Sequence, residues 1–377
     1  MQDFYIVDTT LRDGEQAPGV AFFKKEKVKI AKMLDEAGVD IIEAGIPIMG
    51  KEEMECIEQI IAMQGKAKIL TWNRMHKRDV DASLRCGAEN IHIAVPASDI
   101  QIWQKLKKDR SWVMKEMQKV VSYAAEKGCS VSVGAEDASR TEEDCLIELY
   151  KKAFQAGARR FRYADTLGVL NPTSSYQKIK RIQENIDGEL DFHGHNDFGM
   201  ATANTLSAFQ AGAKYISCSV NGLGERAGNT ALEEIVMVLK ILFECEHPFE
   251  GKKMMTLSQL VEQASGRIIG DGKPIVGKMV FSHESGIHVD GLLKSRNCYE
   301  AFSPEEIGRK TEVILGKHSG SIAVIHCLQE MGIEIAKKQS DEIVKMIHQI
   351  YTHNKKPDID FLLKQWTQVN KKVASRA

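Results

Sequence analysis

The chain has 377 residues, with 51 lysines and arginines against 52 aspartates and glutamates, giving a formal net charge of -1. This balance excludes the strongly positive surface of proteins that bind nucleic acid or anionic membranes, and no run of about eighteen apolar residues predicts a membrane span. The amino terminus lacks a signal-peptide pattern, and the eight scattered cysteines form no CxxC pair. We therefore expect a globular, cytoplasmic protein with reduced thiols.

Short apolar and β-branched runs alternate with longer amphipathic stretches from the amino terminus to about residue 243. The strand-like runs are 4–11, 40–46, 68–73, 90–95, 129–135, 159–164, 190–195 and 214–220. Helix-like segments such as 24–38, 111–128 and 142–158 lie between them and end at or near a glycine. Eight strand–helix units predict an α/β fold, a (β/α)8 TIM barrel over residues 1–250. A doubly wound sheet is the alternative, but no GxGxxG follows the first strand.

The strand–helix alternation stops beyond residue 250. Helical patterns continue at 256–268, 319–332 and 340–354, around a Gly- and His-rich stretch of weak periodicity. We therefore expect a small, mainly helical C-terminal subdomain over residues 251–377.

Polar side chains cluster where the predicted strands end, which is where TIM barrels place their reactive groups. The first strand is followed by Arg12, Asp13 and Gln16. Later strands end in or run into the polar residues Glu43, Glu136, Thr166, His193 and His195. This pattern predicts an active site at the carboxyl end of the barrel.

The HGH motif at the end of the seventh strand carries the most information. Residues i and i+2 of a strand point to the same side, so His193 and His195 can converge on one point. Two imidazoles with an oxygen ligand suit a divalent metal of the Zn, Mn or Fe type. The alternative is that one histidine packs in the core and the other is solvated. Asp13 and Asn229, expected at the same barrel mouth, favour a metal site.

Two further motifs allow more than one interpretation. The loop NGLGERAGN, residues 221–229, resembles a phosphate-binding loop before a helix, but a flexible turn or an internal ion pair of Glu225 with Arg226 fits as well. His288, in SHESGIHVDG, could act as a general base if the subdomain covers a barrel mouth. Otherwise it is an inert surface histidine.

The motifs DTTLRDGEQ, HGHNDFGMA and NGLGERAGN, in this order, resemble the acyl-CoA-condensing barrels of the DRE-TIM metallolyase superfamily. That group contains isopropylmalate, citramalate and homocitrate synthases, and the similarity runs from residue 4 to about 320. EAGIP, TWNR, SVGAEDASR and RYADTLGVLNP are most similar to the short homocitrate synthases of nitrogen fixation. Because the chain stops at 377, we expect it to lack the leucine-regulatory domain of isopropylmalate synthases.

The resemblance implies a role for each motif residue. A divalent metal ion (Mg, Mn or Zn) would bind to Asp13, His193, His195 and Asn229. Arg12 would polarise the ketone of a 2-oxo acid, in a pocket lined by Gln16, Glu43 and Thr166. Glu136 and His288 would belong to the machinery that enolises acetyl-CoA, with His288 supplied by the partner subunit of a homodimer. The loop on the coenzyme A side would contain Gly222, Gly224, Glu225 and Gly228.

This sequence departs from the family pattern at two positions. Lysine-pathway homocitrate synthases carry an arginine for the distal carboxylate where this chain has Ser132, so the anchor must lie elsewhere, and His92, Arg74 and Arg162 are the candidates. Some relatives have a catalytic tyrosine where this chain has Thr311, and Tyr299 lies nearby.

The resemblance implies that acetyl-CoA and 2-oxoglutarate condense to (R)-homocitrate and coenzyme A, for the nitrogenase iron–molybdenum cofactor. A polar pocket wall from TWNR and His92 favours this dicarboxylate. Isopropylmalate or citramalate synthesis, from 2-oxoisovalerate or pyruvate, is the alternative. A retro-Claisen lyase and a non-catalytic metal and 2-oxo acid sensor are more remote ones.

Overall fold

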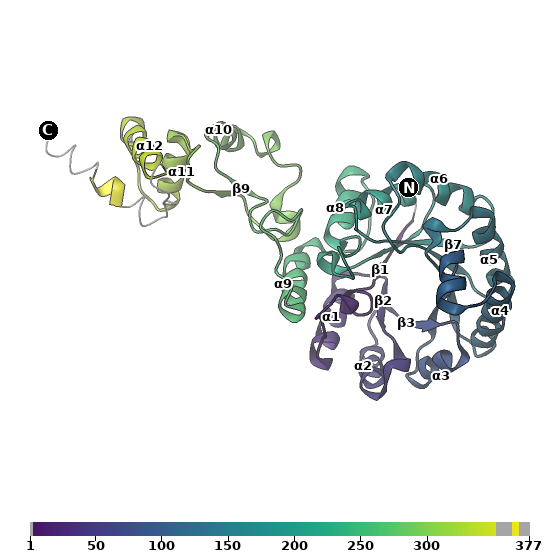
Figure 1. Ribbon diagram of the computed structural model, residues 1–377. Helices are drawn as coiled ribbons and strands as arrows, with labels where there is room; N and C mark the ends of the chain where they lie inside the picture. The colour runs from purple at the N-terminus through teal and green to yellow at the C-terminus, as the bar shows by residue number, and fades with distance from the viewer. Residues whose placement is uncertain (1–2, 352–363, 369–377) are drawn as a thin grey trace, which may run out of the picture. The chain divides into compact units, whose positions relative to one another are not determined.

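The computed structural model describes residues 3–351 and 364–368, and the chain divides into two compact units, Met1–Ile269 and Gly270–Ala377. The first unit is a closed parallel barrel whose strands follow one another in chain order, surrounded by helices (Figure 1). Its strands are β1 Tyr5–Asp8, β2 Ile41–Gly45, β3 Lys68–Arg74, β4 Asn90–Pro96, β5 Ser130–Glu136, β6 Arg160–Asp165, β7 Glu189–Gly194 and β8 Tyr215–Cys218. Its helices are α1 Lys24–Ala37, α2 Lys51–Ala62, α3 Lys77–Arg85, α4 Arg110–Glu126, α5 Glu143–Gln155, α6 Pro172–Gln183, α7 Ala201–Gln210, α8 Leu232–Leu242 and α9 Met254–Ser265. The predicted TIM barrel is confirmed.

Alternation along the strands separates the hydrophobic core from the polar barrel interior. In β4, Ile91 and Ile93 belong to a buried hydrophobic cluster that also contains Val113 of α4. The residues that alternate with them, His92 and Ala94, face the other way and line a cavity. The same alternation in β5, β6 and β7 directs one set of side chains to the helices and the other to the barrel axis.

Local signals explain where several helices begin and end. Asp109 caps α4 by accepting a hydrogen bond from the backbone N–H of Trp112 at 2.7 Å. Asn171 and Ser174 form a capping box at α6, and Pro172 occupies the first turn. Gly38 ends α1 with a φ of 93°, in the left-handed region that favours glycine.

Helix α9 belongs to the first unit, so the boundary between the two units falls after residue 269 in the chain. The sequence predicted this boundary at residue 250. The amide nitrogen of Asn221 donates to the backbone carbonyl of Ser258 at 2.9 Å, and the Ser258 hydroxyl donates to Asn221 Oδ1 at 2.5 Å. These two hydrogen bonds fix α9 to the loop after β8.

The second unit has a helical core of its own. Its elements are β9 Ser282–His283, α10 Gly286–Lys294, β10 Glu312–Val313, α11 Ser321–Glu330 and α12 Lys337–Tyr351. Val324 and Leu328 of α11 pack with Ile343 and Ile347 of α12. The predicted helical C-terminal region is confirmed, although residues 352–363 and 369–377 of the predicted subdomain lie outside the described ranges. Among the residues that the structure describes, no helix is both long and apolar enough to cross a membrane.

Candidate active site and metal centre

A cavity of about 240 Å³ opens at the carboxyl ends of the barrel strands. The predicted residues that line it are Arg12, Asp13, Gln16, His92, Glu136, Arg162, Thr166, His193, His195 and Glu225. These residues come from the loops after β1 and β8, from β4 to β7, and from the positions directly after β6 and β7, so the barrel collects them from distant parts of the sequence. Trp72, from the TWNR segment that was expected in the pocket wall, also lines the cavity, as do Gln101 and Lys105, which were not predicted.

Asp13, His193 and His195 form the one cluster of potential metal ligands found among the described His, Cys, Asp and Glu residues. Their ligand atoms lie within 4.8 Å of one another, and all three residues are buried. The Nε2 atoms of the two histidines are 3.2 Å apart, and His193 Nε2 lies 3.8 Å from Asp13 Oδ2. Since Zn–N bonds are about 2.0–2.1 Å long, two nitrogens at this separation can ligate the same ion.

The protonation of these groups fits a metal centre. Burial lowers the pKa of His193 to about 3 and also lowers the pKa of His195, so both rings are neutral and have lone pairs to give. Burial alone would raise the pKa of Asp13, but Arg12 and the two histidines lower it below its usual range, so the carboxylate is ionised. The Nδ1 atoms of both histidines are buried and find no hydrogen-bond partner in the described part of the chain.

Asn229 lies beside the cluster, where its backbone forms an isolated β-bridge with His195. Its amide nitrogen donates to Asp13 Oδ2 at 2.6 Å and to the carbonyl of Leu223 at 3.2 Å. Its Oδ1 is buried and has no partner among the described residues. Asn229 therefore contacts the cluster with its nitrogen toward Asp13, and its ligand role remains a prediction.

Arg12 is held by two carboxylates. Its Nη1 contacts Asp13 Oδ1 at 2.7 Å, and its Nε and Nη2 contact Glu43 Oε2 at 2.9 and 2.8 Å. Glu43 also pairs with Arg162 Nη1 at 3.0 Å, and Arg162 Nε pairs with Asp191 Oδ2 at 2.8 Å. Glu43 thus lies behind Arg12 and is absent from the cavity lining, whereas the sequence predicted it as a pocket residue.

The loop after β1 is held by a lysine that the sequence did not reveal. Lys27 of α1 is 2% exposed, and its Nζ contacts Glu15 at 2.8 Å and Glu53 at 2.9 Å. Glu15 also accepts a hydrogen bond from the backbone N–H of Phe22. Asp8 accepts two hydrogen bonds from Thr10. These contacts give the acidic residues around Arg12 and Asp13 a structural role.

Two predicted cavity residues have partners of their own. Glu136 Oε2 contacts Lys105 Nζ at 3.0 Å. Lys105 lies on the π-helix η3 Gln101–Leu106, a rare element that is often found at functional sites. The hydroxyl of Thr166 accepts a hydrogen bond from the backbone N–H of Asp137 at 2.9 Å.

The glycine-rich loop packs on itself and on Asn229. A Cβ on Gly228 would lie 2.0 Å from the carbonyl oxygen of Gly222, and a Cβ on Gly224 would lie 2.6 Å from Asn229 Nδ2. Arg226 pairs with Asp197 at 2.8 Å and more loosely with Glu225 at 3.6 Å. The glycines therefore allow the close packing that places Asn229, and contact with coenzyme A remains a prediction.

The candidates for the distal anchor differ in position. Arg74 is 63% exposed and pairs with Asp79, so it is turned away from the cavity. His92 and Arg162 do line the cavity. The sequence did contain a local indication of this pair, because Asp79 lies in the first turn of the helix that follows Arg74.

His288 lies in the second unit. It is exposed, and its ring stacks on Tyr299 with 4.3 Å between the ring centroids. Thr311, in the place of the tyrosine of some relatives, donates from its hydroxyl to Glu300.

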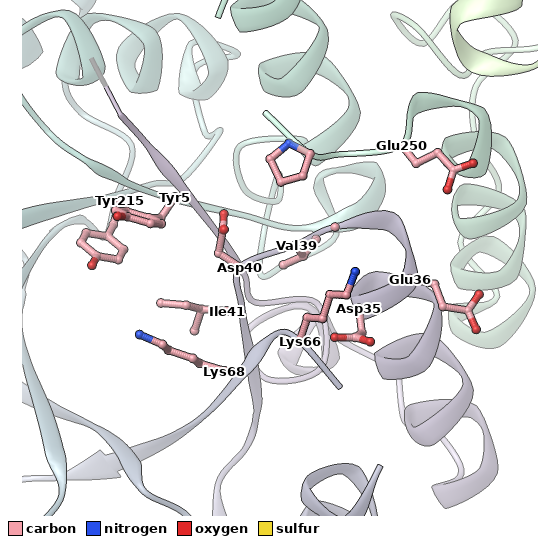
Figure 2. A pocket seen from close by; sticks show the side chains of 12 residues that line it. Tyr5, Asp35, Glu36, Val39, Asp40, Ile41, Lys66, Lys68, Tyr215 and Glu250 are labelled. Atoms are coloured by element: carbon pink, nitrogen blue, oxygen red, sulfur yellow. The ribbon is translucent and has the colours of Figure 1, made fainter. Parts of the chain in front are cut away.

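A separate cavity of about 460 Å³ lies at the amino ends of β1, β2 and β3 (Figure 2). Figure 2 shows Tyr5, Lys68 and Tyr215 on one side of it and the acidic residues Asp35 and Glu36 on the other. TIM barrels place their chemistry at the carboxyl ends of the strands and use the amino ends for stability, and the metal-ligand cluster lies at the carboxyl ends. We therefore take the smaller cavity as the candidate active site.

Comparisons with known proteins follow the division of the chain. A family model described as HMGL-like matches residues 3–261, and one described as homocitrate synthase post-HMGL domain-like matches residues 275–355. The chain is 47% identical over 356 residues to 2-isopropylmalate synthase 2 of Caldanaerobacter subterraneus subsp. tengcongensis, covering 94% of this chain and 93% of that protein. It is 44% identical over 349 residues to homocitrate synthase 1 of Nostoc sp., covering 93% of each. The structure of the HMG-CoA lyase of Bacillus subtilis aligns with 71% of this chain and 96% of its own, with a TM-score of 0.65 and 18% identity, which indicates a shared fold.

Proposed function

This chain belongs to the HMGL-like family, and we propose that it condenses the acetyl group of acetyl-CoA with a 2-oxo acid, 2-oxoglutarate, to give homocitrate and free coenzyme A. One observation carries the proposal: Asp13, His193 and His195 converge beside the guanidinium of Arg12 in one cavity. An electrophilic keto group needs this combination of a metal-ligand set and a fixed cation. Both family matches and both relatives support this class of reaction.

Arg12 stabilises the negative charge that develops on the keto oxygen when the carbon nucleophile attacks. A divalent ion held by Asp13, His193, His195 and Asn229 would supply Lewis-acid polarisation of that keto group. Because Glu43 and Asp13 hold the guanidinium on two sides, Arg12 has little freedom to move during the reaction.

In this proposal Glu136, one of the carboxylates that line the cavity, takes a proton from the methyl group of acetyl-CoA. Lys105 must first release it, since the two side chains form an ion pair at 3.0 Å. The enolate then attacks the keto carbon, and the resulting thioester is hydrolysed by water. Carbon–carbon bond formation and thioester hydrolysis together release one thiol for each homocitrate.

The choice of 2-oxoglutarate rests on hydrogen-bonding groups in the cavity wall. His92 lines the cavity, and Arg162 Nη2 is a buried donor without a partner among the described residues. A pocket built to hydrogen-bond a polar tail rejects an apolar one strongly. Isopropylmalate synthesis is the second candidate, because Trp72, Ala94 and Ala164 give the same wall an apolar part.

We propose in addition that the protein is a homodimer in which His288 reaches the cavity of the partner subunit. Large apolar side chains are exposed in the segments that connect the barrel strands to the following helices, including Met49, Trp103 and Phe198, and a partner would cover such residues. Homocitrate made by this protein would serve as the organic ligand of the nitrogenase iron–molybdenum cofactor. Light scattering tests the dimer, and a monomer with full activity would contradict it.

A panel of 2-oxo acids tests the reaction. Acetyl-CoA-dependent thiol release is measured with 2-oxoglutarate, 2-oxoisovalerate or pyruvate, each with Mg, Mn or Zn. We expect the highest kcat/KM with 2-oxoglutarate, and a higher value with 2-oxoisovalerate would replace homocitrate by isopropylmalate. No thiol release with any acid, together with metal-dependent binding of one of them, would indicate a sensor.

Two arginine variants serve as a matched pair. We expect Arg12→Gln to lower kcat by roughly 100-fold or more, the effect of removing one oxyanion donor. Arg74→Gln should leave kcat/KM close to the wild-type value, because Arg74 faces Asp79 and solvent. A loss in Arg74→Gln confined to 2-oxoglutarate would instead identify Arg74 as the distal anchor.

A further inference from the structure

Three polar side chains form a hydrogen-bonded row across three neighbouring strands. His92 of β4 is the register partner of Ser132 in β5, and Ser132 is the register partner of Arg160 in β6. Arg160 Nη2 donates to Ser132 Oγ at 3.2 Å, and Ser132 Oγ lies 2.9 Å from His92 Nδ1. The row therefore connects Arg160, at the first position of its strand, to a residue that lines the active-site cavity.

The proton of the Ser132 hydroxyl has two possible acceptors. Arginine has no lone pair to offer, so Arg160 can only donate to Ser132 Oγ. The hydroxyl can then donate to His92 Nδ1 at 2.9 Å or to the carbonyl of Ile91 at 3.5 Å. If Nδ1 carried the proton, Ser132 Oγ would accept from both His92 and Arg160, and its own proton would have only the Ile91 carbonyl at 3.5 Å, the limit of a hydrogen bond. Donation from the hydroxyl to Nδ1 avoids this long contact, and donation from a cationic guanidinium makes the hydroxyl a better donor. His92 Nδ1 is therefore the acceptor.

The second ring nitrogen of His92 must then carry the proton. Burial lowers the pKa of His92 well below its ordinary value, so the ring is neutral and has a single N–H. With Nδ1 accepting, that N–H is on Nε2. The donor role of Nε2 thus follows from two residues that themselves lie outside the lining of the active-site cavity.

Gly134 leaves the space that the ring occupies. A Cβ on Gly134 would lie 2.5 Å from His92 Nε2, and both residues line the active-site cavity. Ser132 and Arg160 instead line a different cavity, with Lys68 and Tyr215. They can act on a substrate in the active-site cavity only through His92.

We propose that Arg160 and Ser132 are positioning residues that fix His92 as the Nε2–H tautomer, so that it donates a hydrogen bond to an oxygen in the tail of the 2-oxo acid. The inference rests on the proposed function and names the substrate class of the same site, a 2-oxo acid with a second carboxylate. An aliphatic tail would leave the buried N–H without an acceptor, which selects against it.

The tautomer can be observed without turnover. Long-range 1H–15N correlation spectra of the full chain labelled with 15N-histidine distinguish the two tautomers, and His92→Gln identifies the signals. We expect an Nε2–H pattern for His92 at pH 7.5 in the wild type, and a mixed or altered pattern in Ser132→Ala. An Nδ1–H or doubly protonated ring in the wild type would overturn the proposal whether or not the variant folds.

Kinetics tests the consequence for specificity. We expect Ser132→Ala to lower the ratio of kcat/KM for 2-oxoglutarate over 2-oxoisovalerate by about tenfold, the value of one hydrogen bond to a charged group. The change should lie mainly in KM for 2-oxoglutarate, because the tail contact is the same before and during the reaction. Ser132→Thr retains a hydroxyl and should recover part of the ratio.

The control is Ser122→Ala, which removes a hydroxyl that donates to the carbonyl of Ala156 outside the row, and the ratio should stay unchanged. An unchanged ratio in Ser132→Ala would refute the contact with the tail. No thiol release by the wild type with any 2-oxo acid would overturn the proposed function and the tail contact with it, while the spectra decide the tautomer separately.

Discussion

Replacing Arg162 by methionine removes the guanidinium that lies between two buried carboxylates. The side chain of Arg162 is 3% exposed, and those of Glu43 and Asp191 are fully buried. In the variant, Glu43 keeps Arg12 as a partner, but Asp191 keeps only the hydroxyl of Ser217, at 2.7 Å, among the side chains of the described residues. The variant therefore removes the ion-pair partner of a buried carboxylate, and Arg160 is left to interact with Asp191 through its charge.

The expected cost follows from the burial of these groups. Removing one partner of a buried ion pair costs about 3–5 kcal/mol, and Arg162 serves two carboxylates, so we expect at least about 4 kcal/mol. Arg181 is the matched control, since it also pairs with two carboxylates, Glu143 at 3.0 Å and Asp144 at 2.8 Å, but is 52% exposed. Arg181→Met should therefore cost less than about 1 kcal/mol.

Urea unfolding of the two variants and the wild type, followed at several pH values, measures these differences. Arg12 and Arg162 lower the pKa of Glu43 although burial alone would raise it. A lowered carboxylate pKa stabilises the fold above its unfolded pKa of about 4.5, and this contribution is lost as the pH falls. The deficit of Arg162→Met should thus be largest at pH 7–8 and smaller below about pH 5. Equal deficits in Arg162→Met and Arg181→Met would refute the reasoning.

Three other perturbations have defined outcomes. His195→Ala should lose activity and the metal-induced rise in Tm, while His326→Ala, in the second unit, should keep both; a bound metal in His195→Ala would refute the ligand set. Burial raises the pKa of Asp8 to about 7. The free energy of unfolding of the wild type should therefore fall by roughly 2–3 kcal/mol between pH 5 and 8, and that of Asp8→Asn should not. The same pH dependence in urea unfolding of both proteins would contradict this expectation. Lys27→Met should cost about 3 kcal/mol, because Lys27 is 2% exposed between two carboxylates. The 38% exposed Lys24 provides the control, and equal midpoints for the two lysine variants would exclude this explanation.

The barrel and the metal-ligand cluster could be predicted because their signals are local or follow a general rule. His193 and His195 share a side of a strand by alternation, and the rule that reactive groups lie at strand ends brings Asp13 to them. Asn229 was expected at the same barrel mouth because it lies in the loop after the last strand, its ligand role was implied by the resemblance, and the structure brings it to Asp13.

The interior ion pairs could not be predicted, because they depend on which strands face each other across the barrel. Glu43 and Arg162 lie 119 positions apart in the sequence. The inward direction of Asp191 could have been predicted, because it lies two residues before His193 and therefore faces the same side of β7. Its partner, Arg162, could not have been identified in this way. Arg74 was one of three candidates for the distal anchor, and the sequence did not reveal that it pairs with the nearby Asp79.

The charges around Arg12 determine the order in which the site can be loaded. Two guanidinium groups, on Arg12 and Arg162, face the three carboxylates of Asp13, Glu43 and Asp191, which leaves one net negative charge. Such a site attracts a divalent cation and repels the anion of a 2-oxo acid. A divalent cation held by Asp13, His193 and His195 would reverse the sign and attract the anion. Binding of a 2-oxo acid should therefore be undetectable by calorimetry in chelator and appear only when metal is added.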